Sequence, residues 1–138
     1  MDLIKLREQL IEHEGIRYKP YKCTAGKTTI GVGRNLDDKG ISHAEALILL
    51  ENDISECASD VVAVLGHEMW DRLSDARQRV LVDMRFQLGP GGFRSFRGTL
   101  QAVREGRYKD AAAGMLASRW ATQTPGRAKA LTEMMTEG

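Results

Sequence analysis

The chain has 138 residues, of which 42% are hydrophobic and 28% charged, and its formal net charge is +1. This length favours one domain with a substantial core, and the composition is that of an ordinary folded protein. Residues 1–70 hold 8 Lys and Arg against 12 Asp and Glu, whereas residues 71–138 hold 12 against 7, so the C-terminal half favours an anionic polymer.

The first predicted element is an amphipathic helix that ends near Glu14. Charged residues separate apolar positions that recur at helical spacing. These apolar positions are Leu3, Ile4, Leu6, Leu10 and Ile11. Gly15 is suited to stop the helix, which places Glu14 in the last turn beside the negative end of the helix dipole. That position favours the protonated carboxyl group, the form that a proton donor needs.

A β-hairpin is predicted next, because aromatic and β-branched residues flank a turn that contains glycine. If the loop consists of residues 25–27, Cys23 lies directly opposite Thr29 and both side chains share one face of the sheet. A two-residue loop pairs Cys23 with Thr28 instead. Gly31 and Gly33 indicate a strand that bends or is closely approached by another group.

The spacing of Glu14, Cys23 and Thr29 is the most informative feature of the sequence. Nine positions separate the first two residues and six separate the last two. A carboxylic acid, a thiol and a hydroxyl group around one small space form a workable set for acid-assisted hydrolysis. Taken singly, each residue is more often a surface acid, a small buried thiol or a good strand former.

The rest of the chain is predicted to be helical. Ser42 and Glu45 form a capping box for a helix that continues toward Gly66. Ser74 can cap the next helix, which is predicted to stop at Gly89-Pro90-Gly91-Gly92. Further helical stripes begin near Phe93, near Tyr108 and at Thr124-Pro125. Trp120 is predicted to belong to the core rather than to a substrate platform. The fold class is therefore α+β, mostly helical, with a small antiparallel sheet.

A second region points to the same chemistry as the first. It consists of Phe86-Gln87-Leu88-Gly89 and of the run Ser118-Arg119-Trp120-Ala121-Thr122-Gln123-Thr124-Pro125-Gly126-Arg127-Ala128. Together with Glu14-Gly15, Tyr21-Lys22-Cys23 and Thr29-Ile30-Gly31-Val32-Gly33, these segments resemble the phage-type lysozymes, a family of glycoside hydrolases. The resemblance covers roughly residues 3–129 and is weakest at residues 35–41 and near His67.

The resemblance implies a lysozyme-like fold of residues 1–138 as a single domain. A small sheet lobe, at about residues 15–40, and a helical lobe, at about residues 60–138 packed with the N-terminal helix, would form a cleft that exposes Glu14. The implied activity is that of a bacteriolytic endolysin, which cuts the β-1,4 bond between N-acetylmuramic acid and N-acetylglucosamine in bacterial peptidoglycan.

The resemblance also implies roles for individual residues. Glu14 matches the general acid, and Thr29 matches a residue that helps to hold the attacking water. Cys23 falls where the family has Asp or, in some members, Cys. Arg127 matches an arginine that pairs with the catalytic acid. Three further positions are expected to bind the saccharide: Asn35, Phe86 and Thr99.

Two departures from the family pattern matter. Arg34 stands where the best-known members have His; it could pair with Asp53, but a permanent arginine charge cannot titrate as histidine does. The connection over residues 34–40 is short, which affects the outer part of the saccharide site. A thiol at Cys23 leaves two routes open, namely inverting hydrolysis by a held water and a covalent route through the thiolate.

Two other functions compete with the glycosidase. A Cys-dependent wall peptidase or amidase would use Cys23 as its nucleophile and needs a histidine base, for which His43 is the only plausible candidate. A wall-binding module without catalysis is the third hypothesis. New reducing ends would indicate a glycosidase, new free amines a peptidase or amidase, and neither would indicate binding alone.

Several absences are also expected. Residues 1–5 lack the apolar core of a signal peptide, and no apolar run is longer than residues 46–50, which are too few to span a membrane. We therefore expect the protein in the host cytoplasm, as a monomer that binds no nucleic acid; the resemblance implies a holin for access to the wall. Cys23 and Cys57 are expected to be free thiols. No metal or other cofactor is predicted, because the three histidines lack ligand spacing.

Overall fold

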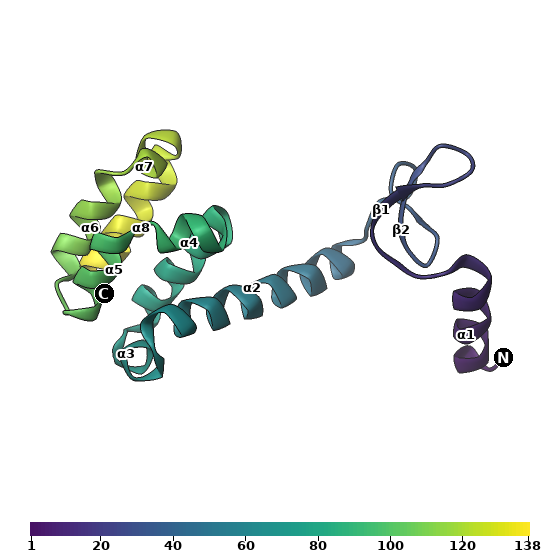
Figure 1. The fold of residues 1–138 in the computed structure, drawn as a ribbon, viewed down its shortest axis with the longest axis horizontal. Helices are drawn as coiled ribbons and strands as arrows, with labels where there is room; N and C mark the ends of the chain where they lie inside the picture. The colour runs from purple at the N-terminus through teal and green to yellow at the C-terminus, as the bar shows by residue number, and fades with distance from the viewer. The chain divides into compact units, whose positions relative to one another are not determined.

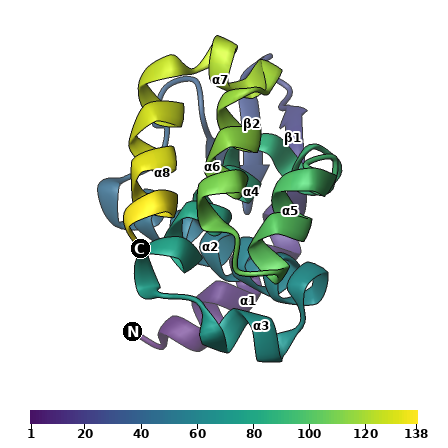
Figure 2. The same cartoon turned by 90° about the vertical axis from the view of Figure 1, so that its left-hand side faces the viewer.

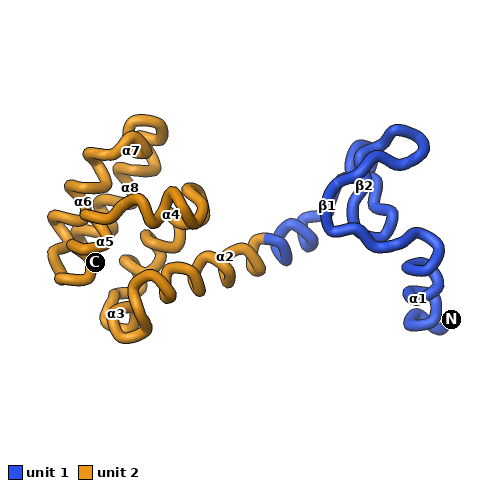
Figure 3. The backbone as a smooth tube through the Cα atoms, viewed as in Figure 1, with its two compact units in different colours: residues 1–49 blue, residues 50–138 orange.

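The structure, a computed structural model, describes all of residues 1–138 and divides into two compact units, coloured blue and orange in Figure 3. Unit 1 comprises residues 1–49 and unit 2 comprises residues 50–138. Helices and a small sheet follow one another in the order drawn in Figure 1. They are α1 (Leu3–Glu14), β1 (Arg17–Lys22), β2 (Thr28–Gly31), β3 (Arg34–Asn35), α2 (His43–Leu65), α3 (His67–Arg72), α4 (Asp75–Arg94), α5 (Arg97–Arg104), α6 (Tyr108–Leu116), α7 (Arg119–Gln123) and α8 (Pro125–Glu137). The predicted α+β class, mostly helical, is confirmed.

Helix α1 has the bounds that its sequence predicts. The carboxylate of Asp2 accepts hydrogen bonds from the N–H groups of Ile4 and Lys5 at 3.0 Å, which caps the first turn. At the other end Gly15 adopts a φ of 73°, and its N–H donates to the carbonyl of Ile11 at 2.8 Å. None of the α1 side chains is buried. The expected packing of this helix with the helical lobe stays a prediction.

The three antiparallel strands form a sheet in the order β1-β2-β3. Tyr21 lies opposite Thr29, so the loop consists of residues 24–26 and the predicted direct pairing of Cys23 with Thr29 is wrong. Gly26 supplies the reason, because a three-residue hairpin loop ends in a left-handed residue and Gly26 has a φ of 77°. Cys23 still lies two residues beyond Tyr21, and therefore diagonal to Thr29 on the same face.

The apolar core lies in unit 2, where α6 packs against α5 and α8, and α8 also packs against α4 (Figure 2). Every buried apolar side chain of the protein lies between Cys57 and Met135. The largest fully buried ones are Phe93, Leu81, Met84, Met115, Met135, Val61, Val80 and Val103. Each such side chain contributes about 1.5–3 kcal/mol to folding, so the helical unit holds most of the hydrophobic stabilisation.

Trp120 belongs to this core, as predicted, with 4% of its surface exposed. Its indole Nε1–H donates to the side-chain oxygen of Gln87 at 2.7 Å, and its ring meets Phe96 edge-to-face at 6.2 Å. The buried indole therefore has both an apolar environment and a partner for its polar atom.

The predicted helix ends are largely confirmed. In the capping box, Ser42 N–H donates to the Glu45 carboxylate at 2.9 Å and Glu45 N–H donates to the Ser42 hydroxyl at 3.1 Å. Ser74 caps α4 through the N–H of Arg77. Within α4 the predicted stop at Gly89 is a sharp break with a φ of 75°, after which the helix resumes. Thr124 precedes α8, but its hydroxyl donates to the Trp120 carbonyl instead of capping.

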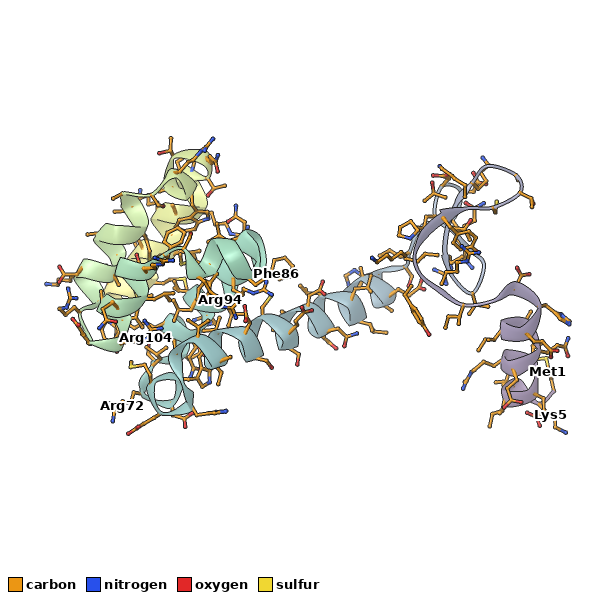
Figure 4. The ribbon with its side chains drawn as sticks, viewed as in Figure 1. Met1, Lys5, Arg72, Phe86, Arg94 and Arg104 are labelled. Carbon is orange, nitrogen blue, oxygen red and sulfur yellow. The ribbon has the colours of Figure 1, made fainter.

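An ionic network that the sequence analysis did not predict connects α2 with α4. The carboxylate of Asp60 accepts a hydrogen bond from Arg85 Nε at 2.6 Å and pairs also with Arg94 (Figure 4). Arg85 Nη1 lies 3.6 Å from the buried sulfur of Cys57. Hydrogen bonding from Arg85 lowers the pKa of Asp60, whereas burial raises the pKa of the Cys57 thiol. Packing of α2 against α4 removes water from the charges of Asp60 and Arg85, and their mutual hydrogen bond takes the place of that water.

Candidate active site

The candidate residues Cys23, Thr29 and Asn35 lie on one face of the unit 1 sheet. Thr29 pairs with Tyr21 on β1 and with Asn35 on β3, so the side chains of Tyr21, Thr29 and Asn35 form a row across the strands. Directly opposite residues of antiparallel strands project from the same face. Cys23 follows β1 at the diagonal position, next to this row. The hairpin thus brings together the thiol and the hydroxyl group that the sequence singles out.

The Cys23 thiol lies in a turn that stabilises its ionised form. Backbone N–H groups of Lys27 and then Ala25 lower the pKa of Cys23 by hydrogen bonding to the sulfur, although partial burial acts in the opposite direction. The backbone itself is fixed by two further bonds, from Cys23 N–H to the Lys27 carbonyl at 3.0 Å and from Gly26 N–H to the Cys23 carbonyl at 2.8 Å. A sulfur with more thiolate character is a better acceptor for a water molecule and also a better nucleophile.

Thr29 is the one buried residue of unit 1, with 3% of its surface exposed. Its hydroxyl group donates a hydrogen bond to the Lys27 carbonyl at 2.9 Å. The proton is therefore directed away from any ligand, and the oxygen lone pairs remain as acceptors. A water held by Thr29 would accordingly donate to it.

The carboxyl group of Glu14 lies against the backbone of Gly33. A Cβ atom added at Gly33 would stand 3.1 Å from Glu14 Oε2, closer than side chains normally approach. Gly33 also has a φ of 64°, which residues with a side chain rarely adopt. The prediction that another group closely approaches the end of this strand is confirmed, and the approaching group is the candidate acid.

Arg34 binds residues other than its expected partner. Its Nη1 lies 2.7–2.9 Å from the Glu45 carboxylate and 3.2 Å from the carbonyl of Gly40. Hydrogen bonds from Arg34 and then Ser42 lower the pKa of Glu45 to about 2. The proposed pairing of Arg34 with Asp53 is therefore wrong, because the capping glutamate of α2 offers a carboxylate closer in the chain.

Asn35 holds the turn that follows β3. Its side-chain oxygen accepts from the N–H of Asp38, and its Nδ2 donates to the Asp38 carboxylate, both at 2.9 Å. The amide group is thus engaged locally, although the side chain stays half-buried on the face of Thr29. Saccharide binding by Asn35 stays a prediction.

The other candidate residues lie in unit 2, in two separate hollows. Phe86 on α4, labelled in Figure 4, is 44% exposed. It borders a largely apolar hollow of about 590 Å³. Thr99 on α5 is buried and borders a different hollow of about 780 Å³ beside Trp120. Arg127 lines the first hollow and pairs with Asp83, its Nε lying 2.8 Å from that carboxylate. The pairing of Arg127 with Glu14, and the saccharide contacts of Phe86 and Thr99, stay predictions.

Tyr21 and Arg17 form a part of this face that the sequence analysis missed. The guanidinium carbon of Arg17 lies 4.6 Å from the centre of the half-buried Tyr21 ring. The alternation of side chains along the strand indicates which residues share a face with Tyr21. Which residue lies opposite Thr29 depends on the hairpin register, however, and the sequence predicts Cys23 there, two residues beyond the observed Tyr21.

Comparison with known proteins agrees with this architecture. A helix that ends at an acid, a small sheet that carries a thiol and a hydroxyl group, and a helical core make up a lysozyme-like α+β fold. The model of the phage lysozyme family matches residues 11–134, and the chain belongs to that family.

Three curated relatives align with nearly the whole chain. The pre-baseplate central spike protein Gp5 of Enterobacteria phage T4 is 28% identical over 98% of this chain and 28% of its own length. The peptidoglycan hydrolase gp36 of Pseudomonas phage phiKMV is 32% identical over 97% of this chain and 15% of its own length. A probable T4-type lysozyme 2 of Dictyostelium discoideum is 28% identical over 96% of this chain and 94% of its own. The chain therefore spans less than a third of the first two relatives.

Three properties of the whole chain bear on the site. No helix combines the length and the apolar character that crossing a membrane requires. No group of three or more His, Cys, Asp or Glu side chains is arranged to hold a metal ion. Both cysteines are free.

Proposed function

We propose that this chain is an endolysin that hydrolyses the β-1,4 bond between N-acetylmuramic acid and N-acetylglucosamine in bacterial peptidoglycan. Membership of the phage lysozyme family carries the proposal, and the name of the phiKMV relative, a peptidoglycan hydrolase, supports it. The unit 1 site supports the same chemistry, since it combines a carboxyl group at a helix end with a thiol and a hydroxyl group on one sheet face.

In the proposed reaction, Glu14 donates its proton to the glycosidic oxygen as the bond from that oxygen to the anomeric carbon breaks. A water molecule held by Cys23 and Thr29 attacks the anomeric carbon from the opposite side of the sugar. The water gives up one proton, which the Cys23 thiolate accepts, and exchange with solvent restores both groups. The lowered pKa of Cys23 raises the fraction of thiolate, the form that can accept a hydrogen bond and a proton from the water.

The proposed function is tested by incubating the protein with purified sacculi and assaying new reducing ends and new free amines in parallel. Reducing ends without amines are the expected result. Amines without reducing ends would overturn the proposal in favour of a peptidase or amidase, in which Cys23 is the nucleophile and His43, exposed at the start of α2, is the base. Neither product would leave a wall-binding module.

The role of Cys23 is decided by two substitutions. If Cys23 holds and deprotonates the water, Cys23→Asp keeps activity because a carboxylate accepts the same hydrogen bond, whereas Cys23→Ala loses most of it. Activity close to that of the wild type in Cys23→Ala would show that Thr29 and the backbone hold the water alone.

The stereochemistry of the product separates the inverting route from the covalent one. Attack by water inverts the anomeric centre and gives an α-product from the β-linked substrate. Attack by the thiolate forms a glycosyl-thioether, and its hydrolysis returns a β-product. An initial β-product together with a trapped thioether would replace the inverting mechanism by the covalent one.

A further inference from the structure

The hairpin of unit 1, which holds Cys23 and Thr29, carries an excess of positive charge. Residues 15–36 contain five Lys and Arg and no Asp or Glu. Two of these cations are neutralised, since Lys27 pairs with Asp38 and Arg34 pairs with Glu45. Among the others, Arg17 on β1 has no carboxylate within salt-bridge distance and makes no hydrogen bond through its guanidinium group. The edge strand β1, in the unit that holds Glu14, is therefore strongly basic and favours an anionic partner.

Arg17 is also the cation whose position is fixed. Its guanidinium group stacks on the ring of Tyr21, 4.6 Å from the ring centre, and Tyr21 lies directly opposite Thr29. The strand register shifts between Arg17 and Tyr21, yet the guanidinium group still lies over the Tyr21 ring. Stacking uses the face of the guanidinium plane and leaves the N–H groups along its edge free, in the fork that matches a carboxylate.

The substrate itself supplies a suitable anion. N-acetylmuramic acid contributes the anomeric carbon of the bond that is cut, and it also carries the peptide stem, whose carboxyl groups are ionised at neutral pH. A glycan strand held at Cys23 and Thr29 therefore brings a carboxylate-bearing peptide to the same face of the sheet.

We propose that Arg17, positioned by Tyr21, is a binding residue for a stem-peptide carboxylate of the peptidoglycan strand. This inference rests on the proposed function and extends it from the sugar to its peptide. Arg17 would favour wall whose stem carboxylates are free over wall in which they are amidated.

The test measures binding of the inactive Glu14→Gln protein to purified sacculi by co-sedimentation, with native sacculi and with sacculi whose carboxyl groups have been chemically amidated. Adding Arg17→Ala is expected to weaken binding to native sacculi about fivefold, the size of one exposed but well-formed ionic contact. The same change is expected to leave binding to amidated sacculi unaltered.

Arg7→Ala is the matched control, because Arg7 is an exposed arginine on α1 without an ion-pair partner, so both variants lose one positive charge from unit 1. Equal losses from Arg17→Ala and Arg7→Ala would overturn the inference in favour of general charge attraction. A loss that persists on amidated sacculi, and disappears after phosphodiester polymers are stripped from the wall, would assign Arg17 to phosphate instead.

The positioning role of Tyr21 is tested separately. Tyr21→Phe keeps the ring under the guanidinium group, so this variant is expected to bind native sacculi as tightly as the protein with Tyr21. Tyr21→Leu should reproduce part of the loss of binding seen with Arg17→Ala. Equal binding by the Phe and Leu variants would show that the stack does not position Arg17. Release of reducing ends by the chain with an intact Glu14, measured on the same sacculi, keeps a failure of this inference distinct from a failure of the proposed function.

Discussion

The two units of the protein differ in where their stability and their chemistry lie. Unit 2 contains every buried apolar side chain, whereas unit 1 buries a single residue, Thr29, which is polar. Unit 1 nevertheless holds the candidate acid, thiol and hydroxyl group. Its sheet is arranged by polar contacts instead, including the Arg34–Glu45 ion pair and the hydrogen bond from Thr28 N–H to the Asp37 carboxylate at 2.7 Å.

Substitutions should therefore separate activity from stability according to the unit in which they fall. A core substitution in unit 2 removes dispersion contacts and apolar burial that fold the helices. A substitution at the unit 1 candidate site removes a group that we propose to react or to orient a reacting group, with little apolar burial to lose.

The largest effect is expected for Glu14→Gln. The amide keeps the shape of the side chain but cannot donate the catalytic proton, so lysis of sacculi should fall by about 10²–10⁴-fold. The melting temperature should stay within about a degree, because Glu14 is exposed at a helix end. Glu12→Gln, in the same helix, is the control and should keep full activity. Substantial lysis by Glu14→Gln would remove Glu14 from the acid role.

The complementary change in unit 2 is Asp60→Asn, which should cost stability rather than chemistry. It leaves Arg85, only 8% exposed, without its carboxylate partner, and a loss of about 3 kcal/mol is expected in urea unfolding. Asp75→Asn, which removes the partner of the exposed Arg79, is the control and should have a much smaller effect.

The pH dependence of the Asp60 contribution follows from the direction of its pKa shift. A carboxyl group whose folded pKa lies below its unfolded value stabilises the fold above the unfolded pKa, about 4. The advantage of the wild type over Asp60→Asn should therefore be complete at neutral pH and shrink as the pH falls below 4. An advantage that is constant down to pH 2 would contradict the ionic explanation.

An intermediate effect is expected at Gly33, where one substitution should change both activity and stability. In Gly33→Ala the new methyl group displaces the Glu14 carboxyl group, so activity should fall roughly tenfold, and the positive φ should cost about 1 kcal/mol. Gly31→Ala is a close control, since Gly31 has a φ of 68° but no atom within 4 Å of the added Cβ. Equal activity losses in the two variants would show that strain, and not contact with Glu14, is responsible.

The smallest effect is expected for Ser42→Ala. Loss of the reciprocal cap should destabilise the first turn of α2 by about 1 kcal/mol, measured as faster amide hydrogen exchange at Glu45 and Ala46. The lysis rate per folded molecule should not change. A global loss of protection throughout α8 would show that the two units unfold together, which would weaken the separation of stability from chemistry.

Local signals in the sequence predicted the features that depend on neighbouring residues. Glu14 at the end of a helix, the stop at Gly15 and the Ser42–Glu45 cap each follow from hydrogen bonds that span at most four residues. The break at Gly89 likewise follows from one residue that can adopt a positive φ.

Features that depend on choices among distant partners were not predicted. The hairpin register differed from the expectation because the left-handed last position of the loop fell at Gly26 rather than at Lys27. The ion pair of Arg85 with Asp60 joins residues 25 positions apart, and Arg34 had more than one carboxylate to choose from. Charges carry little information on their partners until the fold brings them together.

The opposite shifts of the two thiols have a practical consequence for labelling. Cys23 is half-buried with a lowered pKa, whereas Cys57 is 5% exposed with a raised one. A thiol-specific fluorophore applied near neutral pH reacts with the thiolate and should therefore mark Cys23 and spare Cys57 without any cysteine having to be removed. The unmodified sequence thus offers a single-site optical reporter at the candidate active site, whose fluorescence change would test whether soluble wall fragments bind there.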